Sequence, residues 1–289
     1  MGLAKSTELT GMTNHVGFAK PTGLTCINKT ALKEVEIKEI KDFLELKTRC
    51  YSKPSFVDTD PVSIPHRYSD KQDIEISGFL TATISWGQRT SIIKKAGELM
   101  QMMDDRPYEF IINSSEVELD SIDYFVYRTF NRTDCITFLK ALRNIYLNHG
   151  GLEEVFCQGF SKNKSIYDAI IHFREVFFEV PHYLRTCKHV SNPAKGSAAK
   201  RINMFLRWMV RNDYNGIDFG IWDNISPQYL CCPLDLHVGN VARKLGLIQR
   251  KQNDWKAVEE LTSVLKIMDP DDPVKYDIGL FGLGVFERF

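Results

Sequence analysis

A chain of 289 residues, 43% of them hydrophobic, is long enough to bury one large core or two smaller ones. Its 37 basic and 37 acidic side chains balance, which excludes a polycation that binds nucleic acid through net charge alone. No apolar run approaches the ~18 residues of a membrane span, so we expect no membrane partner and a cytoplasmic location.

The seven cysteines are scattered and include no C-x-x-C pair. Both a zinc finger and an iron–sulfur cluster need cysteines that are closely grouped in the sequence. We therefore expect neither a metal ion nor another cofactor.

Residues 1–30 are polar and lack a hydrophobic period, which predicts a flexible N-terminal tail. From residue 31 to residue 289 helical periodicity dominates, so this region is predicted to be mainly α. Apolar stripes at helical spacing include Ile37, Ile40 and Leu44, then Ile76, Phe79, Leu80, Thr83 and Ile84, then Ile166, Ala169, Ile170, Phe173 and Phe177. Only YFVYRTF, residues 124–130, is ambiguous between strand and helix.

Two aspartates are placed where helices begin. Asp134 is predicted to cap a helix that ends at Gly150, and Asp235 to cap a second helix. In the second helix Val238 and Val241 form a buried stripe, and Gly246 is the stop signal.

The segment from Val180 to Asn212 contains no Asp or Glu. It carries seven Lys and Arg residues, namely Arg185, Lys188, Lys195, Lys200, Arg201, Arg207 and Arg211. This distribution predicts a positive surface lobe, and phosphate is its natural partner.

Within this segment, residues 192–211 predict a tight turn followed by an amphipathic helix. Ala198, Ile202, Phe205 and Met209 share one apolar face, while Lys200, Asn203, Arg207 and Arg211 share another. Pro193 and Gly196 precede the helix, where free backbone amides and the helix dipole suit an anion.

This turn and helix resemble the hairpin and second helix of the helix-hairpin-helix DNA glycosylase (HhH-GPD) superfamily, which includes endonuclease III. The motif of that superfamily reads roughly P-G-V-G-x-K-T-A-N. Gly196 matches its first glycine, Lys200 its lysine and Asn203 its asparagine, while Ala198 stands at the second glycine.

Two further segments carry the resemblance. Residues 234–246 are similar to the V-D-x-H-V-x-R-V-x-x-R-L-G segment, in which the aspartate is the catalytic carboxylate; Asp235 matches it. SWGQRTS, residues 85–91, is similar to a turn whose glutamine enters the DNA, and Gln88 is its counterpart.

The matches follow one another in the order of the superfamily, and 34 residues separate Lys200 from Asp235. This long connection is closer to the archaeal 8-oxoguanine glycosylase branch, and the whole chain looks most like a bacterial family of unknown function inside the superfamily. The resemblance implies an all-α fold of two helical lobes with a cleft between them. The middle lobe would span roughly residues 75–190, and the other lobe roughly residues 191–289 plus the N-terminal helix.

The implied function is that of a DNA repair N-glycosylase, with an AP-lyase step in some members, that acts on a flipped damaged base. Lys200 and Asp235 would be catalytic, and His237 a packing or phosphate contact. The DNA-binding residues would be Gln88 and Arg89 as the wedge, and Gly196, Ser197, Ala198, Arg201 and Arg207 as the backbone grip. Trp86, Trp208 and Trp222 are candidates for lining the base pocket. The expected partner is DNA, with RNA as the alternative, and the expected state is a monomer.

Two other interpretations remain open. One is a nucleic-acid-binding protein that kept the scaffold and lost the reaction. The other is a metal hydrolase that uses Asp235 and His237 with acids from DPDD, residues 269–272.

Overall fold

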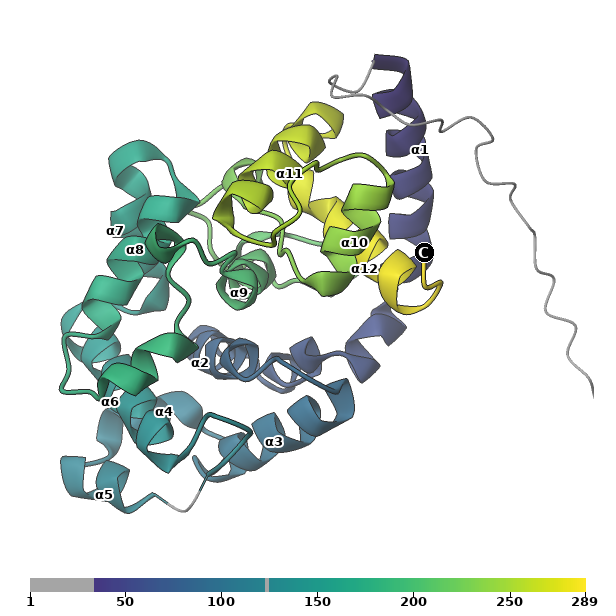
Figure 1. Ribbon diagram of the computed structural model, residues 1–289. Helices are drawn as coiled ribbons and strands as arrows, with labels where there is room; N and C mark the ends of the chain where they lie inside the picture. The colour runs from purple at the N-terminus through teal and green to yellow at the C-terminus, as the bar shows by residue number, and fades with distance from the viewer. Residues whose placement is uncertain (1–33, 123–124) are drawn as a thin grey trace, which may run out of the picture.

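A computed structural model describes residues 34–122 and 125–289 and shows a mainly helical protein (Figure 1). The α-helices are α1 Glu34–Tyr51, α2 Lys71–Thr83, α3 Arg89–Gln101, α4 Pro107–Asn113, α5 Glu116–Ser121, α6 Arg132–Asn148, α7 Leu152–Asn163, α8 Ile166–Phe177, α9 Lys200–Val210, α10 Leu236–Lys244, α11 Trp255–Met268 and α12 Asp277–Val285. Short 3-10 helices connect them: η1 Pro54–Thr59, η2 Pro61–Ser63, η3 Pro65–Arg67, η4 Leu184–His189, η5 Pro193–Lys195, η6 Pro227–Tyr229 and η7 Pro273–Tyr276. The predicted tail, residues 1–30, lies outside the described residues.

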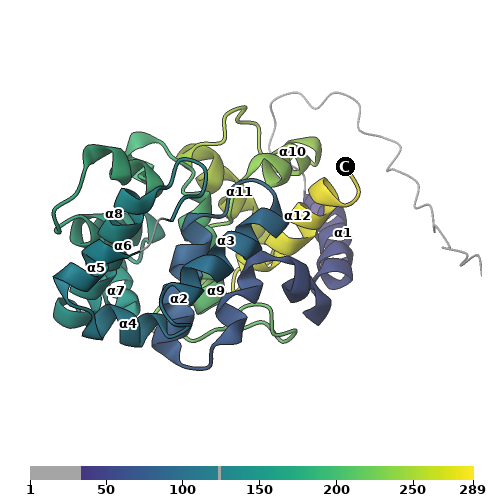
Figure 2. The same cartoon turned by 90° about the horizontal axis from the view of Figure 1, so that it is seen from below.

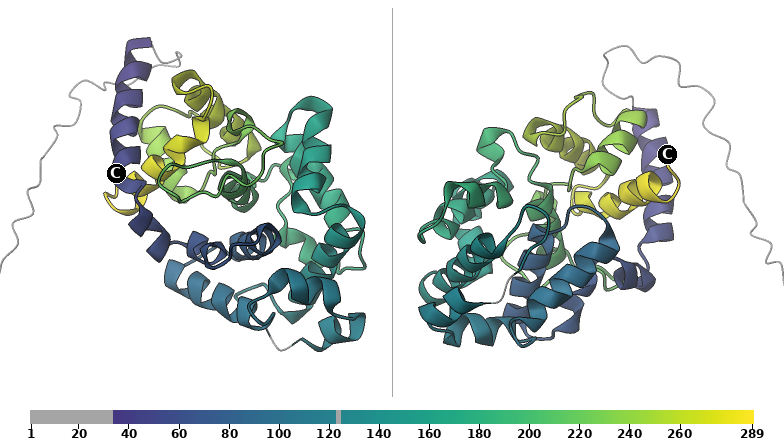
Figure 3. Two further views of the ribbon diagram at one scale, coloured as in Figure 1. Left: turned by 180° about the vertical axis from the view of Figure 1, so that it is seen from behind. Right: turned by 60° about the horizontal axis from the view of Figure 1, so that its bottom comes forward.

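Helices α2 and α9 pack against each other in the middle of the molecule. On one side of this pair α1, α10, α11 and α12 gather, and on the other side α4 to α8 (Figure 2). The first and last described helices, α1 and α12, lie side by side, which the purple and yellow ribbons of Figure 3 make visible.

The contact between α2 and α9 depends on a glycine. A Cβ atom at Gly78 would lie 3.1 Å from the terminal methyl group of Met209 and 3.5 Å from the ring of Phe205. The missing side chain therefore lets the two helices approach closely. At the next residue, the ring of Phe79 lies 5.6 Å from that of Phe205 and 5.3 Å from that of Phe173, so aromatic contacts join α2, α8 and α9.

The ambiguous heptapeptide forms neither a strand nor a helix in the described residues. Tyr127 and Phe130 exchange two backbone hydrogen bonds around a tight turn, in which Arg128 has a φ of 55°. The hydroxyl group of Tyr127 donates to the carbonyl group of Trp86 at 2.8 Å. This turn therefore supports the loop that precedes α3.

The prediction for the start of α6 was wrong by three residues. Asn131 is the N-cap, and Asp134 is the third helical residue of a capping box in which each side chain accepts from the backbone of the other residue. Asp134 is fully buried because it also accepts from Thr186 at 2.7 Å and from Arg185 at 2.8 Å. The helix ends at Asn148 with His149 as its C-cap, and Gly150 follows with a φ of 77°, so the predicted exit at this glycine is confirmed.

The predicted polar face of α9 is also corrected. Arg207 is 5% exposed and Arg211 is 8% exposed, because both guanidinium groups form ion pairs inside the protein. Arg207 pairs with Asp218 and Asp277, and Arg211 with Asp218 and Asp272. Helical spacing cannot reveal acids that arrive from other parts of the chain.

The positive lobe predicted for the acid-free segment is accordingly smaller. Arg185, Lys188 and Lys195 are exposed, whereas Lys200 and Arg201 are partly buried. Only part of the predicted phosphate-binding surface is therefore in contact with solvent.

We expect Arg211→Met to lower the free energy of unfolding by about 3 kcal/mol, because Asp272 loses its cation and the buried Asp218 keeps only Arg207. Urea denaturation of the variant measures this loss. Arg250→Met removes an exposed pair with Asp254 and should change stability far less. Equal effects of the two substitutions would contradict the assignment of Arg211 to a buried network.

Candidate functional site

A cleft with a volume of about 510 Å³ opens where α3, α9, α10 and α12 meet the η1–η2 segment. It is lined by Phe56, Asp60, Pro61, Ser85, Trp86, Gly87, Arg89, Ile92, Lys200, Met204, Arg207, Trp208, Pro233, Asp235, Leu236, His237, Val238, Asp277, Ile278, Phe281 and Val285. Aromatic, acidic and basic side chains thus face one space, a composition typical of ligand sites.

Lys200 and Asp235 both line this cleft, although 34 residues separate them in the chain. Lys200 begins α9, and its ammonium group lies 3.5 Å from the sulfur atom of Met204. Asp235 caps α10, where its Oδ1 accepts from the backbone N–H of Val238 at 2.9 Å. Among the described residues Oδ2 of Asp235 makes no hydrogen bond. The structure therefore brings the two predicted catalytic groups to one opening and holds the carboxylate by the helix backbone.

Asp277 is an acidic residue of this cleft that the sequence analysis missed. It begins α12, is 6% exposed, and accepts from the guanidinium group of Arg207. Burial raises the pKa of Asp277 to about 6; Arg207 opposes this rise and the nearby charge of Asp235 adds to it. A possible signal was an acid at the head of the apolar stretch IGLFGLGV, residues 278–285.

Asp60 is a second acidic residue that the sequence analysis missed. It caps η2 by accepting from the N–H of Val62 at 3.2 Å, and its Oδ2 lies 3.9 Å from Nε of Arg89. Burial raises the pKa of Asp60, while the positive charges of Arg89, Arg207 and Lys200 lower it. Lys200 also lowers the pKa of Asp277, so its charge acts on two carboxylates of the cleft.

Two of the three predicted tryptophans line the cleft. Trp86 and Trp208 face it together with Phe56 and Phe281, which supplies flat apolar walls. Trp222 is placed elsewhere: it is buried and donates to Glu75 at 2.6 Å.

The two wedge candidates separate in the structure. Gln88 is exposed at the N-terminus of α3, where its side chain makes no capping hydrogen bond. Arg89 instead turns into the cleft, with its guanidinium carbon 4.7 Å from the centre of the Phe281 ring and 5.6 Å from that of Phe286. These contacts and Asp60 hold Arg89 between α3 and α12. The side chain that was predicted to enter DNA as part of the wedge therefore lies in the wall of the cleft.

His237 is exposed at the edge of the cleft, next to Phe281, with ring centres 6.4 Å apart. A Cβ atom at Gly284 would lie 2.9 Å from Cβ of His237. His237 is thus packed against α12, in line with a contact role.

The hairpin residues lie outside the cleft lining. Gly196 is exposed with a φ of 81°, and a Cβ atom there would meet no heavy atom within 4 Å. Ser197 accepts from the N–H of Ala199 through its hydroxyl group at 3.2 Å, and the carbonyl group of Ala198 accepts from the side chain of Asn203. Ala199 is the N-cap of α9, has the left-handed conformation and gives the helix no side-chain cap. The first backbone N–H groups of the helix therefore have no side-chain acceptor at the cap.

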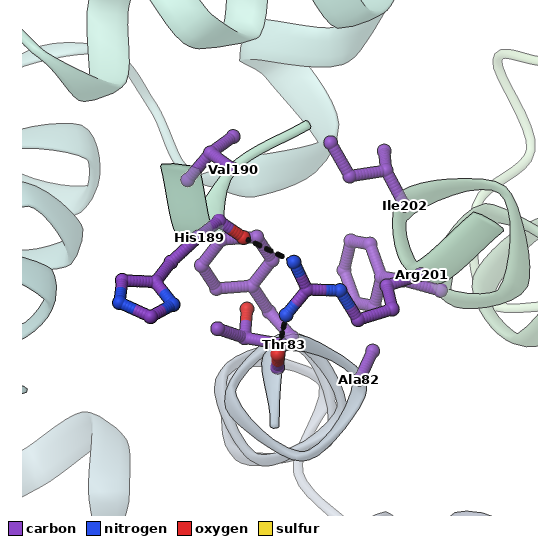
Figure 4. A pocket seen from close by; sticks show the side chains of 8 residues that line it. Ala82, Thr83, His189, Val190, Arg201 and Ile202 are labelled. Atoms are coloured by element: carbon purple, nitrogen blue, oxygen red, sulfur yellow. Dashed lines mark hydrogen bonds between the residues drawn. The ribbon is translucent and has the colours of Figure 1, made fainter. Parts of the chain in front are cut away.

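Arg201 has an internal role. Its guanidinium group donates to the carbonyl groups of Thr83 and His189, the latter at 3.1 Å, beside a small cavity of about 10 Å³ (Figure 4). Burial lowers the pKa of Arg201 to about 10. Because both ends of the guanidinium group hold protein carbonyls, the predicted contact of Arg201 with DNA phosphate is corrected to a structural link between α2, η4 and α9. Arg207 is likewise removed from the phosphate grip by its buried ion pairs.

The acids of the metal-hydrolase interpretation do not gather around Asp235 and His237. Asp269 pairs with Lys275 at 2.6 Å, and Asp272 pairs with Arg211 at 2.8 Å. Within residues 34–122 and 125–289, no group of three or more His, Cys, Asp or Glu side chains is arranged to hold a metal ion.

The fold and the cleft define a mainly helical protein with a mixed-charge, aromatic-walled site. Residues 60–286 match the family described as "Protein of unknown function (DUF2400)", and because the match covers most of the chain, the protein belongs to this family. Comparisons with curated proteins and with solved structures gave no match. No helix in the described part of the chain combines the length and apolar character needed to cross a membrane.

The raised pKa of Asp277 predicts a pH dependence of stability. Between about pH 4 and pH 6 the folded protein keeps a proton that the unfolded chain has released, so stability falls as the pH rises through this window. In Asp277→Asn this contribution is absent. Across the window the free energy of unfolding of the wild type should therefore fall by about 1–3 kcal/mol relative to the variant. Urea denaturation at a series of pH values tests this, and parallel curves for the two proteins would contradict it.

Proposed function

We propose that this protein is a DNA glycosylase of the helix-hairpin-helix type, with a lyase step, that removes a flipped base held in the cleft. In this proposal the helices on either side of α2 and α9 are the two lobes. The observation that supports it most is that Lys200 and Asp235 line one cleft with aromatic walls. An amine and a carboxylate that share a site are the two groups such a reaction needs.

The cleft suits a base that has left the double helix. Its aromatic residues Trp86, Trp208, Phe56 and Phe281 offer flat surfaces on which a ring can stack. Asp277 and Arg207 provide polar groups beneath these walls. Stacking surfaces with a few polar groups are how base-flipping enzymes bind the extruded base.

The chemistry assigns one role to each catalytic side chain. The neutral amine of Lys200 attacks C1′ of the deoxyribose while the bond from C1′ to the base breaks, and the base leaves with the electron pair and is protonated. Asp235 stabilises the positive charge on the sugar through its unbonded Oδ2 and accepts the proton released by the amine. The sugar then opens to a Schiff base on Lys200, from which elimination cleaves the strand.

The hairpin supplies the grip on the backbone. The start of α9 has no side-chain cap, and the positive end of its dipole points out beside the exposed Gly196. Lys195 is exposed in the same turn. A phosphate bound there places the strand close to Lys200, while the exposed Gln88 enters the gap left by the flipped base. DNA is the partner in this proposal, and the protein acts as a monomer in the cytoplasm.

We expect borohydride to trap a covalent adduct between the protein and a lesion-containing duplex, because it reduces the Schiff base to a stable amine. The substrates are a panel of duplexes with one oxidised, deaminated or alkylated base each. The adduct should be lost in Lys200→Gln and kept in Lys162→Gln, a matched control at the exposed end of α7. Asp235→Asn should lower the rate of base release by about 100-fold or more.

A panel that yields neither product nor adduct would overturn the enzymatic proposal. Salt-sensitive DNA binding that persists in Asp235→Asn, without cleavage of any substrate, would instead identify a nucleic-acid-binding protein on the same scaffold. Cleavage that a chelator abolishes would favour the metal-hydrolase interpretation.

A further inference from the structure

The hydrogen-bonding groups of the cleft are unevenly satisfied. Each of its three carboxylates already accepts from the protein: Asp60 from the N–H of Val62, Asp235 from the N–H of Val238, and Asp277 from Arg207. The acidic side of the cleft therefore has protein partners before any ligand binds.

Donors of the same cleft lack such partners. The indole N–H of Trp208 and one terminal nitrogen of Arg89, Nη2, are buried and have no hydrogen-bond acceptor among the described residues. The ammonium group of Lys200 contacts only the sulfur atom of Met204 within hydrogen-bond distance. The cleft thus carries donors without acceptors, and an occupant that brings acceptors would satisfy them.

Trp208 is the sharpest case because its side chain is 0% exposed. A buried donor without an acceptor is destabilising, because it has lost its hydrogen bonds to water and gained none in the protein. Two other tryptophans avoid this cost, since Trp222 donates to Glu75 at 2.6 Å and Trp255 donates to Glu259 at 2.9 Å. No aromatic ring of the described residues is paired with Trp208 and could serve as a weak acceptor in its place.

The position of Trp208 points to the occupant of the cleft. Lys200, Met204 and Trp208 follow one another at intervals of four residues, so they lie along one face of α9, and all three line the cleft. A ring that presents its sugar bond to Lys200 therefore has its far edge toward Trp208, two turns along the helix.

We propose that Trp208 is a specificity-determining residue whose indole N–H donates to an exocyclic carbonyl oxygen of the base in the cleft. This inference rests on the proposed function. A carbonyl oxygen projects beyond the ring and offers two lone pairs, whereas an exocyclic amino group is itself a donor and opposes the N–H. The preferred substrates are therefore bases with an oxo group at the far edge of the ring.

Three free purines that differ in their carbonyl groups test the inference: adenine has none, hypoxanthine has one at C6 on the far edge, and 8-oxoadenine has one at C8, next to the nitrogen that carries the sugar. The probe is the ¹H–¹⁵N spectrum of the full chain labelled at its four tryptophan indoles. Substitution of each tryptophan by Phe in turn assigns the signals, so the assignment of Trp208 does not depend on one variant. The signals of Trp222 and Trp255, already bonded to glutamates, are internal controls.

We expect hypoxanthine to move the Trp208 indole proton downfield and to leave Trp222 and Trp255 unchanged. Adenine and 8-oxoadenine, which both lack a far-edge oxo group, should produce no downfield shift. Trp208→Phe should weaken the binding of hypoxanthine by about tenfold or more and change adenine binding little. Trp255→Phe, which removes an indole outside the cleft lining, should leave the affinities for all three purines unchanged.

Binding of hypoxanthine without a shift of Trp208, or an equal shift with adenine, overturns this inference and leaves the proposed glycosylase intact. Failure of all three purines to bind also overturns it. The proposed function is then decided separately, because borohydride trapping on DNA depends on Lys200 and not on Trp208.

Discussion

The buried ion pairs of Arg207 determine the geometry of the site. This guanidinium group comes from the middle of α9, and its partners are Asp218 in the following loop and Asp277 at the start of α12. A buried cation is tolerated only when carboxylates compensate its charge, so α9, the loop and α12 must fold into one arrangement. Lys200 lies two helical turns before Arg207 on α9, and the start of α12 faces Asp235. The ion pairs that stabilise the core thereby also fix which charges meet in the cleft.

The sequence predicts the local features of this arrangement well. Helical periodicity identifies the mainly α fold, and the role of Asp235 as a helix cap is confirmed by its bond to Val238. Both predictions concern residues only a few positions apart in the chain. At that range the geometry of the helix backbone alone determines which groups meet. The tight turn before α9 was predictable for the same reason. Pro193 restricts the backbone φ angle at the start of η5, and Gly196 adopts the left-handed conformation that ends it.

The rest of the site depends on partners that are distant in sequence, and this limits what a pattern can reveal. Arg207 and Arg211 fall on the polar side of an amphipathic helix, where basic residues are usually solvated. Their burial follows from acids 7 to 70 residues further along the chain. Asp60 and Asp277 were missed for the same reason, since neither belongs to a motif and each reaches the cleft only through the fold. Arg201 lies beside a predicted phosphate site, where the sequence pattern indicates a contact with DNA. Its guanidinium group instead donates to carbonyl groups of the protein itself.

The unmet donors of the cleft are informative because of where they lie. Other buried polar atoms of the described residues also lack a partner, among them the hydroxyl groups of Ser63 and Tyr68, but they do not line the cleft. Glu75, in contrast, is 2% exposed and accepts from both Tyr146 and Trp222. The indole N–H of Trp208 has no acceptor, and this costs stability at the cleft itself. Local departures of this kind are expected where a structure serves binding and not folding, and here the departure lies on the same face of α9 as Lys200. The cost in stability and the candidate chemistry therefore coincide in one cleft.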